Sequence, residues 1–60
     1  MSPKQADKLI GKTVTLTDVY DSSGELTITS RDRWCILGVD NSGHEVKIDR
    51  TDIKSWSVQT

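Results

Sequence analysis

Apolar residues recur at every second position through most of the chain, and this spacing predicts β-strands. Residues 13–17, 25–30 and 44–49 alternate in this way, and the first of these segments is rich in β-branched residues, which favour strands. One face of each strand is therefore expected to point into a core. The positions that the alternation turns inward are Val14, Leu16, Leu26, Ile28, Val46 and Ile48.

Two further segments are predicted to be strands, although their patterns differ. Residues 34–39 form an almost continuous apolar run, which is typical of a strand buried on both faces, so we expect it to be the central strand. Residues 53–58 form the last strand after one 3₁₀-type turn at residues 50–52. With Ile53 inward and a regular strand, Trp56 faces outward. Val19 breaks the parity of the first strand, which predicts a bulge or a strand end near Asp18.

A single helix is predicted over residues 2–10, before the strands begin. Ser2 is a suitable N-cap, Pro3 suits the first helical position, and Gly11 suits the stop. Ala6, Leu9 and Ile10 would then form one apolar stripe at spacings of three and four residues. A helix this short needs to pack against a sheet to be stable.

Polar and glycine-containing segments separate the strands and predict tight turns at residues 21–24, 31–32 and 40–43. In the first of these turns, Gly24 is the residue expected to adopt a positive φ. Five short strands bury their apolar faces economically by closing into a barrel. We therefore predict a mainly β protein of one domain spanning residues 1–60. Its short helix at residues 3–10 precedes a five-stranded antiparallel SH3-like or Sm-like barrel over residues 12–58.

Composition narrows the class of protein without naming its function. Valine, isoleucine and leucine total 14 of 60 residues and the net charge is −1, so the chain is expected to fold. No apolar run is long enough for a membrane span or resembles a secretion signal, which favours a cytoplasmic protein without membrane contact. Cys35 is the one cysteine, so an internal disulfide and a multi-cysteine zinc site are excluded, and we expect a buried thiol.

Catalytic patterns are weak, and we predict that the chain is not an enzyme and uses no cofactor, metal or small-molecule substrate. His44 adjoins a turn and has no nucleophile pattern near it in the sequence. The seven serines include no Gly-x-Ser-x-Gly elbow. The four glycines are isolated from one another, so no glycine-rich phosphate loop is present.

Basic and aromatic residues are better candidates for a binding site. They group at the junction into the third strand and around the last turn, and the two groups would approach each other in a small barrel. Arginine makes bidentate contacts with phosphate or carboxylate, and tryptophan offers a face for stacking. The alternative is that the charges keep strand edges soluble and that the tryptophans belong to the core or to a subunit contact. The predicted binding residues are Arg31, Arg33, Trp34, Arg50, Lys54 and Trp56.

Acidic residues form a second candidate surface. One group surrounds the first turn and another follows the second half of the chain, and a face of carboxylates suits a basic protein surface, including one that normally holds nucleic acid. The alternative is ordinary turn chemistry, because aspartate side chains bond to nearby backbone N–H groups. The residues concerned are Asp18, Asp21, Glu25, Asp40, Glu45, Asp49 and Asp52.

The chain resembles the Sm/Hfq-like small barrels over residues 9–58. The similar segments are Leu9-Ile10-Gly11-Lys12 leading into Val14-Thr15-Leu16, the turn from Asp21 to Gly24, and the end strand from Ile53 to Val58. The stretch from Trp34 to Ile53 is also similar to Rof-type proteins, small barrels that bind the transcription terminator Rho. The resemblance implies a role in RNA metabolism or transcription regulation.

The family's RNA-binding residues do not carry over to this chain. Where the Sm pattern has an asparagine three residues after an aspartate, Asp32 is followed by Cys35. The segment before the last strand, Ile48-Asp49-Arg50, lacks the family's arginine–glycine pair and its tyrosine–lysine–histidine run. A shared fold does not by itself imply a shared function.

Two functional hypotheses follow from these patterns. The first is a binding module that contacts RNA or an RNA-binding protein through the predicted residues. The second is a protein-interaction or inhibitor module, of cellular or viral origin, that uses a strand edge and an exposed Trp56. A net charge of −1 argues against binding nucleic acid by bulk charge and favours the second hypothesis. A 60-residue domain without disulfide or metal also gains stability from association, so homo-oligomers are an expectation.

Overall fold

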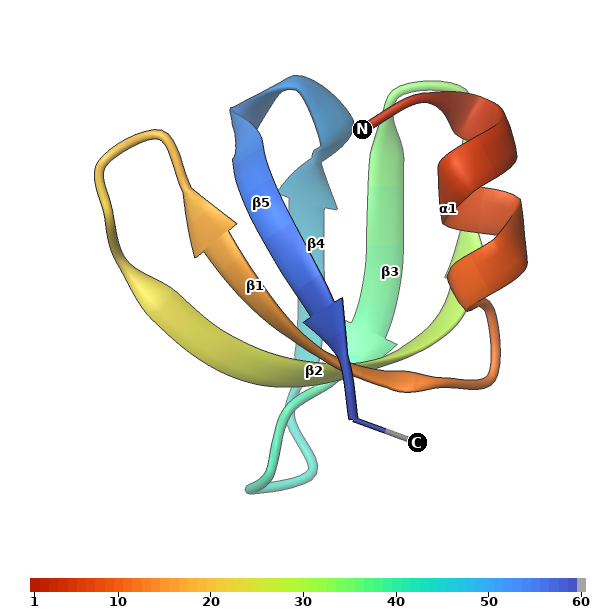
Figure 1. The fold of residues 1–60 in the computed structure, drawn as a ribbon. Coiled ribbons are helices and arrows are strands. Elements are labelled where there is room, and N and C mark those ends of the chain that lie inside the picture. Colours follow the sequence, from red (N-terminus) through yellow and green to blue (C-terminus); the bar gives the residue numbers. More distant parts are fainter. Residues whose placement is uncertain (60) are drawn as a thin grey trace.

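The computed structural model describes residues 1–59 and has one helix followed by five strands (Figure 1). All strand pairs are antiparallel, so the mainly β prediction is confirmed. The elements are α1 (Pro3–Leu9), β1 (Thr13–Asp18), β2 (Ser23–Arg31), β3 (Cys35–Val39), β4 (Glu45–Asp49), the 3₁₀ helix η1 (Arg50–Asp52) and β5 (Ile53–Val58).

Helix α1 begins and ends with the predicted chemistry. The Ser2 hydroxyl accepts a hydrogen bond from the Gln5 N–H, and the Gln5 side chain accepts one from the Ser2 N–H, which completes a capping box. Gly11 has a φ of +86° just beyond the helix. The prediction for Ile10 is wrong: it lies after the helix with an extended backbone and is 42% exposed. Only Ala6 and Leu9 form the helix face that the core buries.

The strand order is β4-β3-β2-β1-β5, which places β2 in the centre. The prediction that the third strand is the central one is therefore wrong, although no residue of β3 is exposed whereas five residues of β2 are. Strand β2 has nine residues, and its first half pairs with β1 while its second half pairs with β3. Strand β3 alternates like its neighbours: Ile36 and Gly38 are buried, and Leu37 between them is half-buried. The apolar run of β3 thus covers one fully buried face and one half-exposed face.

The sheet curves strongly around its apolar face, and β4 and β5 form its two ends (Figure 1). The chain passes directly from β4 through η1 into β5. No ladder within residues 1–59 joins β4 to β5. Closure of the sheet into a barrel therefore stays a prediction.

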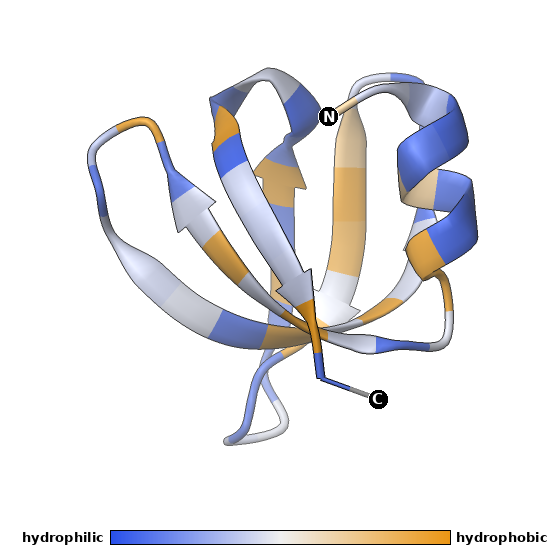
Figure 2. Cartoon of the chain, viewed as in Figure 1, coloured by the Kyte–Doolittle hydropathy of each residue, from blue (hydrophilic) through white to orange (hydrophobic). Residues whose placement is uncertain are grey.

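The core forms from inward positions on the strands together with α1, and hydrophobic and hydrophilic residues alternate clearly along β1, whereas β3 is hydrophobic over most of its length (Figure 2). The prediction of the inward faces of the first two strands is confirmed, and Val46 and Ile48 are half-buried against the same core. The buried residues are Ala6, Leu9, Val14, Leu16, Leu26, Ile28, Ile36 and Ile53.

Trp56 is half-buried and packs against the core, so its predicted outward orientation is wrong. The cause is a register shift between β1 and β5. Asp18 lies opposite Ile53, whereas Thr17 lies opposite Ser55, so β5 has one extra residue at this point. The irregularity predicted near Asp18 is confirmed, and it reverses the parity of the rest of β5. Trp56 consequently lies opposite the buried Leu16.

The turn between β1 and β2 differs from its prediction, because β2 begins at Ser23 and includes Gly24. Asp21, and not Gly24, adopts the left-handed conformation, with a φ of +63°. The Asp18 Oδ1 atom accepts hydrogen bonds from the N–H groups of Tyr20 and Ser22, both at 2.9 Å. Aspartate tolerates this backbone conformation better than most residues, so the turn does not need a glycine.

Candidate functional site

Four of the predicted binding residues gather around the β2–β3 connection. The Arg50 Nη2 atom donates to the Arg33 carbonyl oxygen at 2.6 Å, and the Arg50 N–H donates to the Trp34 carbonyl oxygen at 2.9 Å. The end of β2, the connection and η1 therefore meet, as the sequence suggested. Arg31, Arg33, Trp34 and Arg50 contribute to this meeting point in different ways.

Arg50 and Arg31 are both engaged in bonds within the protein. The Arg50 Nη1 atom donates to the Met1 carbonyl oxygen at 3.0 Å, so this half-buried side chain ties the N-terminus to the β2–β3 connection. Arg31 forms a two-point ion pair with Asp7 of α1, whose second bond measures 3.1 Å. This hydrogen bond lowers the pKa of the Asp7 carboxyl and raises the pKa of Arg31. Neither guanidinium is presented freely to a ligand.

Arg33 and Trp34 form an exposed pair beside them. The guanidinium carbon of Arg33 lies 5.1 Å from the centroid of the Trp34 ring, a cation–π distance, and Trp34 is 62% exposed. Asp32 shapes this loop by accepting hydrogen bonds from the N–H groups of Cys35 and Trp34 at 2.7 and 2.8 Å. Trp34 lies just outside β3, which corrects its predicted place in the third strand.

The remaining predicted site residues lie elsewhere. The Lys54 Nζ atom is 2.8 Å from a carboxylate oxygen of Asp21 at the β1–β2 turn. Trp56 packs against the core and is not an exposed anchor. Cys35 is a free thiol that is half-buried, so the prediction of a fully buried cysteine is wrong. Outward positions in β3 are covered only in part, which explains the difference.

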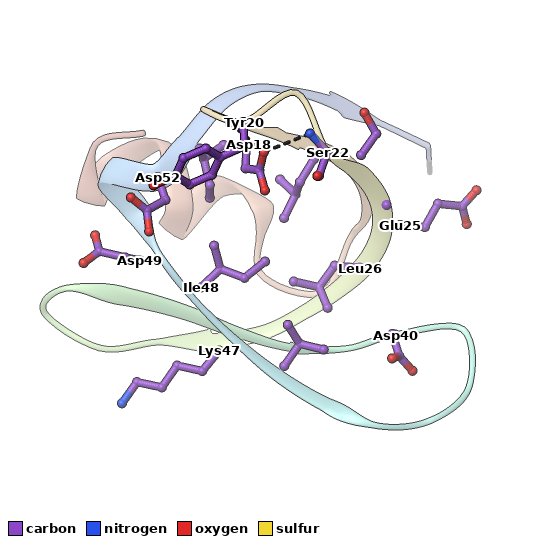
Figure 3. Close-up of a pocket in the computed structure, with 15 residues that line it drawn as sticks. Asp18, Tyr20, Ser22, Glu25, Leu26, Asp40, Lys47, Ile48, Asp49 and Asp52 are labelled. Atoms are coloured by element: carbon purple, nitrogen blue, oxygen red, sulfur yellow. Dashed lines mark hydrogen bonds between the residues drawn. The ribbon is translucent and has the colours of Figure 1, made fainter.

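A cleft of about 380 Å³ opens between β4 and the β1–β2 hairpin (Figure 3). Its floor is apolar, and the close-up shows side chains such as Leu26 and Ile48 directed toward the centre of the ring of strands. The η1 turn and the beginning of β5 contribute the rest of the wall. The apolar residues of the floor are Leu16, Leu26, Val46, Ile48 and Ile53.

Carboxylates surround this apolar floor, and Figure 3 shows several of them on the periphery of the ring. They are contributed by both acidic groups of the sequence, which the curvature of β2 brings together. Lys47 is the one basic side chain among the lining residues. The carboxylates are Asp18, Glu25, Asp40, Asp49 and Asp52. Two acidic residues noted in the sequence are not part of the cleft: Asp21 pairs with Lys54, and Glu45 lies outside it.

Hydrogen bonds keep part of this rim ionised. The Asp40 carboxylate accepts from the His44 and Ser42 N–H groups, and these bonds hold the pKa of Asp40 below its ordinary value. The Thr51 N–H and hydroxyl donate to Asp49 and likewise lower the pKa of that carboxyl. Both interpretations of the acidic residues thus apply to these side chains: they shape turns and they place negative charge around the cleft.

Tyr20 is the functional candidate that sequence reasoning missed. It is 84% exposed at the tip of the β1–β2 hairpin and lines the cleft. Exposed tyrosines are common anchors at protein interfaces. An apolar pair, Val19-Tyr20, stands immediately before a polar turn, and this is the sequence signal from which Tyr20 could have been found.

Residues 1–59 contain neither a cluster of metal-ligating side chains nor a helix that could span a membrane. No three side chains among histidine, cysteine, aspartate and glutamate come close enough together to hold a metal ion. None of the described helical residues belongs to a helix with the length and apolarity needed to cross a bilayer.

Comparison with protein-family models, curated proteins and solved structures found no match to this chain. The resemblance to Sm-like and Rof-type barrels therefore stays a prediction.

Proposed function

We propose that this chain is a non-enzymatic binding module that docks a basic protein surface in the cleft between β4 and the β1–β2 hairpin. The observation that carries the proposal is an apolar floor ringed by five carboxylates and one lysine. A nucleic-acid-binding protein is a suitable partner, because lysines and arginines line the surfaces that neutralise phosphates. The proposal retains the expected link to RNA metabolism through a protein rather than through direct contact with RNA.

The apolar floor and the charged rim make different contributions to such an interface. Burial of apolar side chains supplies most of the favourable free energy, and Tyr20 at the mouth is placed to cover a docked segment. The carboxylates attract a basic partner and disfavour an acidic one. Because Asp40 and Asp49 have lowered pKa values, the rim retains charge in mildly acidic solution.

The proposal is tested with a short fluorescent peptide of alternating lysine and leucine, whose binding is followed by anisotropy. The peptide should bind the wild type, and its affinity should fall as salt is added. The double substitution Glu25→Gln and Asp52→Asn should weaken binding by about threefold or more, as loss of two exposed charge pairs implies. Within residues 1–59, neither carboxylate takes part in a side-chain hydrogen bond or ion pair.

Asp7→Asn is the matched control, because it neutralises a carboxylate on α1, outside the cleft and away from the β4 edge. It should leave the peptide affinity close to that of the wild type. No binding of the peptide at low salt, or equal affinity for the wild type and the double variant, would overturn the proposal.

The exposed Arg33–Trp34 pair favours a second candidate function, binding of single-stranded RNA by stacking. A base could stack on Trp34 while the Arg33 guanidinium contacts a phosphate. Titration of labelled single-stranded RNA at low and moderate salt tests this candidate, with Trp34→Ala as the variant. Absence of binding at both salt concentrations removes it. The cleft proposal does not depend on that outcome.

A further inference from the structure

The outer edge of β4 carries backbone groups that no strand of residues 1–59 pairs with, since β4 ends the sheet. Backbone bonds join Asp40 to His44 and Arg50 to Trp34 at the two ends of the β3–β4 ladder. Hydrogen-bonded pairs alternate along an antiparallel ladder. His44, Val46 and Ile48 therefore direct their backbone groups toward β3. The N–H and C=O groups of Glu45, Lys47 and Asp49 point to the outer edge.

This free edge borders the cleft. Residues 46–49 of β4 form one wall, and residues 23–26 of β2 form another. Those β2 residues pair with β1 on one side, whereas β3 pairs only with the second half of β2, from Thr27 onward. The cleft is thus a gap in the sheet where β2 has curved away from the β3–β4 hairpin. The cleft runs along β4 from Val46 to Asp49, which is the length of a short added strand.

We infer that an extended segment of a basic protein enters this gap and adds to the sheet as a strand along the outer edge of β4. The inference rests on the proposed function and specifies how the partner is held. Main-chain bonds to Glu45, Lys47 and Asp49 supply affinity, and side chains at alternate positions supply specificity, as in other cases of strand addition. The segment has apolar residues at every second position, with lysine or arginine between them.

The order of apolar and basic residues in the partner segment follows from the alternation of inward and outward side chains along β4. Side chains on the inner face of an added strand lie over Val46 and Ile48, which are half-buried and apolar. Side chains on the outer face lie beside those of Lys47 and Asp49. Lys47 is already engaged, because its Nζ atom lies 3.6 Å from the Asp32 carboxylate. The unmatched charge around the gap is therefore negative.

A second copy of this chain is a poorer occupant of the same gap. Its own β4 edge carries Glu45 and Asp49, so pairing two copies edge to edge would add carboxylates to a cleft that already holds five. Like charges placed opposite each other on neighbouring strands are destabilising. A basic segment removes this repulsion and replaces it with attraction.

Amide hydrogen exchange of the ¹⁵N-labelled protein with the lysine–leucine peptide tests the inference. With the peptide about tenfold above its Kd, exchange of the Lys47 and Asp49 amides should slow by about tenfold, because bound molecules are protected. A peptide of the same sequence, N-methylated at alternate residues so that it cannot pair, should bind much more weakly. Equal binding of both peptides, or unchanged exchange at these amides, would overturn strand addition while leaving the cleft proposal intact.

A pair of variants separates the backbone of β4 from its side chains. Lys47→Pro removes the outward N–H without removing a bond to β3, since proline is tolerated at such edge positions. Lys47→Ala removes the side chain and its ion pair but keeps the N–H. Strand addition requires weak binding only in the proline variant, provided that its circular dichroism matches the wild type. If Lys47→Pro unfolds, the amide-exchange experiment on the wild type decides whether the peptide adds to β4 as a strand.

Failure of the unmodified peptide to bind at all contradicts the proposed function itself. A doubling of mass in light scattering, abolished by the peptide, would show that a second copy occupies the gap and would overturn the inference.

Discussion

The same substitution, isoleucine to alanine, should have different costs at Ile36 and Ile10. Ile36 of β3 is fully buried, whereas Ile10 beyond α1 is 42% exposed. The change removes three carbons, and at about 0.8 kcal/mol per buried group the transfer free energy at Ile36 is about 2.4 kcal/mol. The cavity left in a packed core raises the expected loss to about 2–5 kcal/mol.

The loss at Ile10 should be much smaller. About three-fifths of the side chain is covered, so the transfer free energy is about 1.4 kcal/mol at most. The site lies at the surface, where neighbouring atoms relax and no closed cavity forms. We therefore expect a loss of about 1 kcal/mol or less at Ile10.

Thermal and urea unfolding followed by circular dichroism measure both values. A change of 1 kcal/mol shifts the Tm of a domain this size by about 4–8 °C, so the two variants are readily distinguished. Thr27→Ala, which removes a half-buried hydroxyl bonded to Thr13, should also cost far less than Ile36→Ala. Equal losses from Ile36→Ala and Ile10→Ala would refute the assignment of the inward face.

Three further predictions concern packing, pH and the two tryptophans. Gly38→Ala should cost about 3 kcal/mol or more, because its Cβ would lie 2.4 Å from the Thr27 carbonyl oxygen, and urea unfolding measures this loss. Backbone hydrogen bonds from Cys35 and Trp34 lower the pKa of Asp32, so its stabilisation is complete above the ordinary value of 3.8 and is lost as the pH falls through the lowered value. Asp32→Asn should therefore reduce the dependence of Tm on pH below about pH 4; an unchanged dependence contradicts this cause. Trp56→Ala should lower stability by about 2 kcal/mol and Trp34→Ala by far less, and the reverse order would contradict their placement.

Alternation of apolar residues was sufficient to predict most of the fold. It placed Val14, Leu16, Leu26 and Ile28 on the inner face, and the structure buries all four. The helix start and the turn at residues 40–43 were also predictable, since Ser2, Pro3 and Gly43 have local preferences that tertiary contacts do not oppose.

The errors share a physical cause, which is that strand parity holds only while the register is regular. One extra residue between Ile53 and Ser55 turned Trp56 inward, although the irregularity itself was expected nearby. The apolar run of β3 suggested burial on both faces, yet β2 is the central strand because its length lets it pair with two neighbours. The register of β5 and the position of β2 in the sheet depend on pairing between distant segments, and the local spacing of apolar residues contains no information about that pairing.

The candidate site was only partly predictable. The sequence placed Arg31, Arg33 and Trp34 in one group and Arg50 and Lys54 in another. The structure brings Arg50 to the first group and leaves Lys54 apart, and the sequence could not show that Arg31 and Arg50 are committed to structural bonds. The acidic residues were noted as two separate groups. Their union around one cleft depends on the curvature of β2, which no local pattern expresses.

The most direct test of the central claim is a map of chemical-shift changes in the ¹⁵N-labelled protein during titration with the lysine–leucine peptide. If the peptide docks in the cleft, the changes concentrate at Tyr20, Leu26, Val46 and Ile48, around the carboxylate-ringed floor. Changes centred on Arg33 and Trp34, with the cleft residues unaffected, would contradict docking in the cleft.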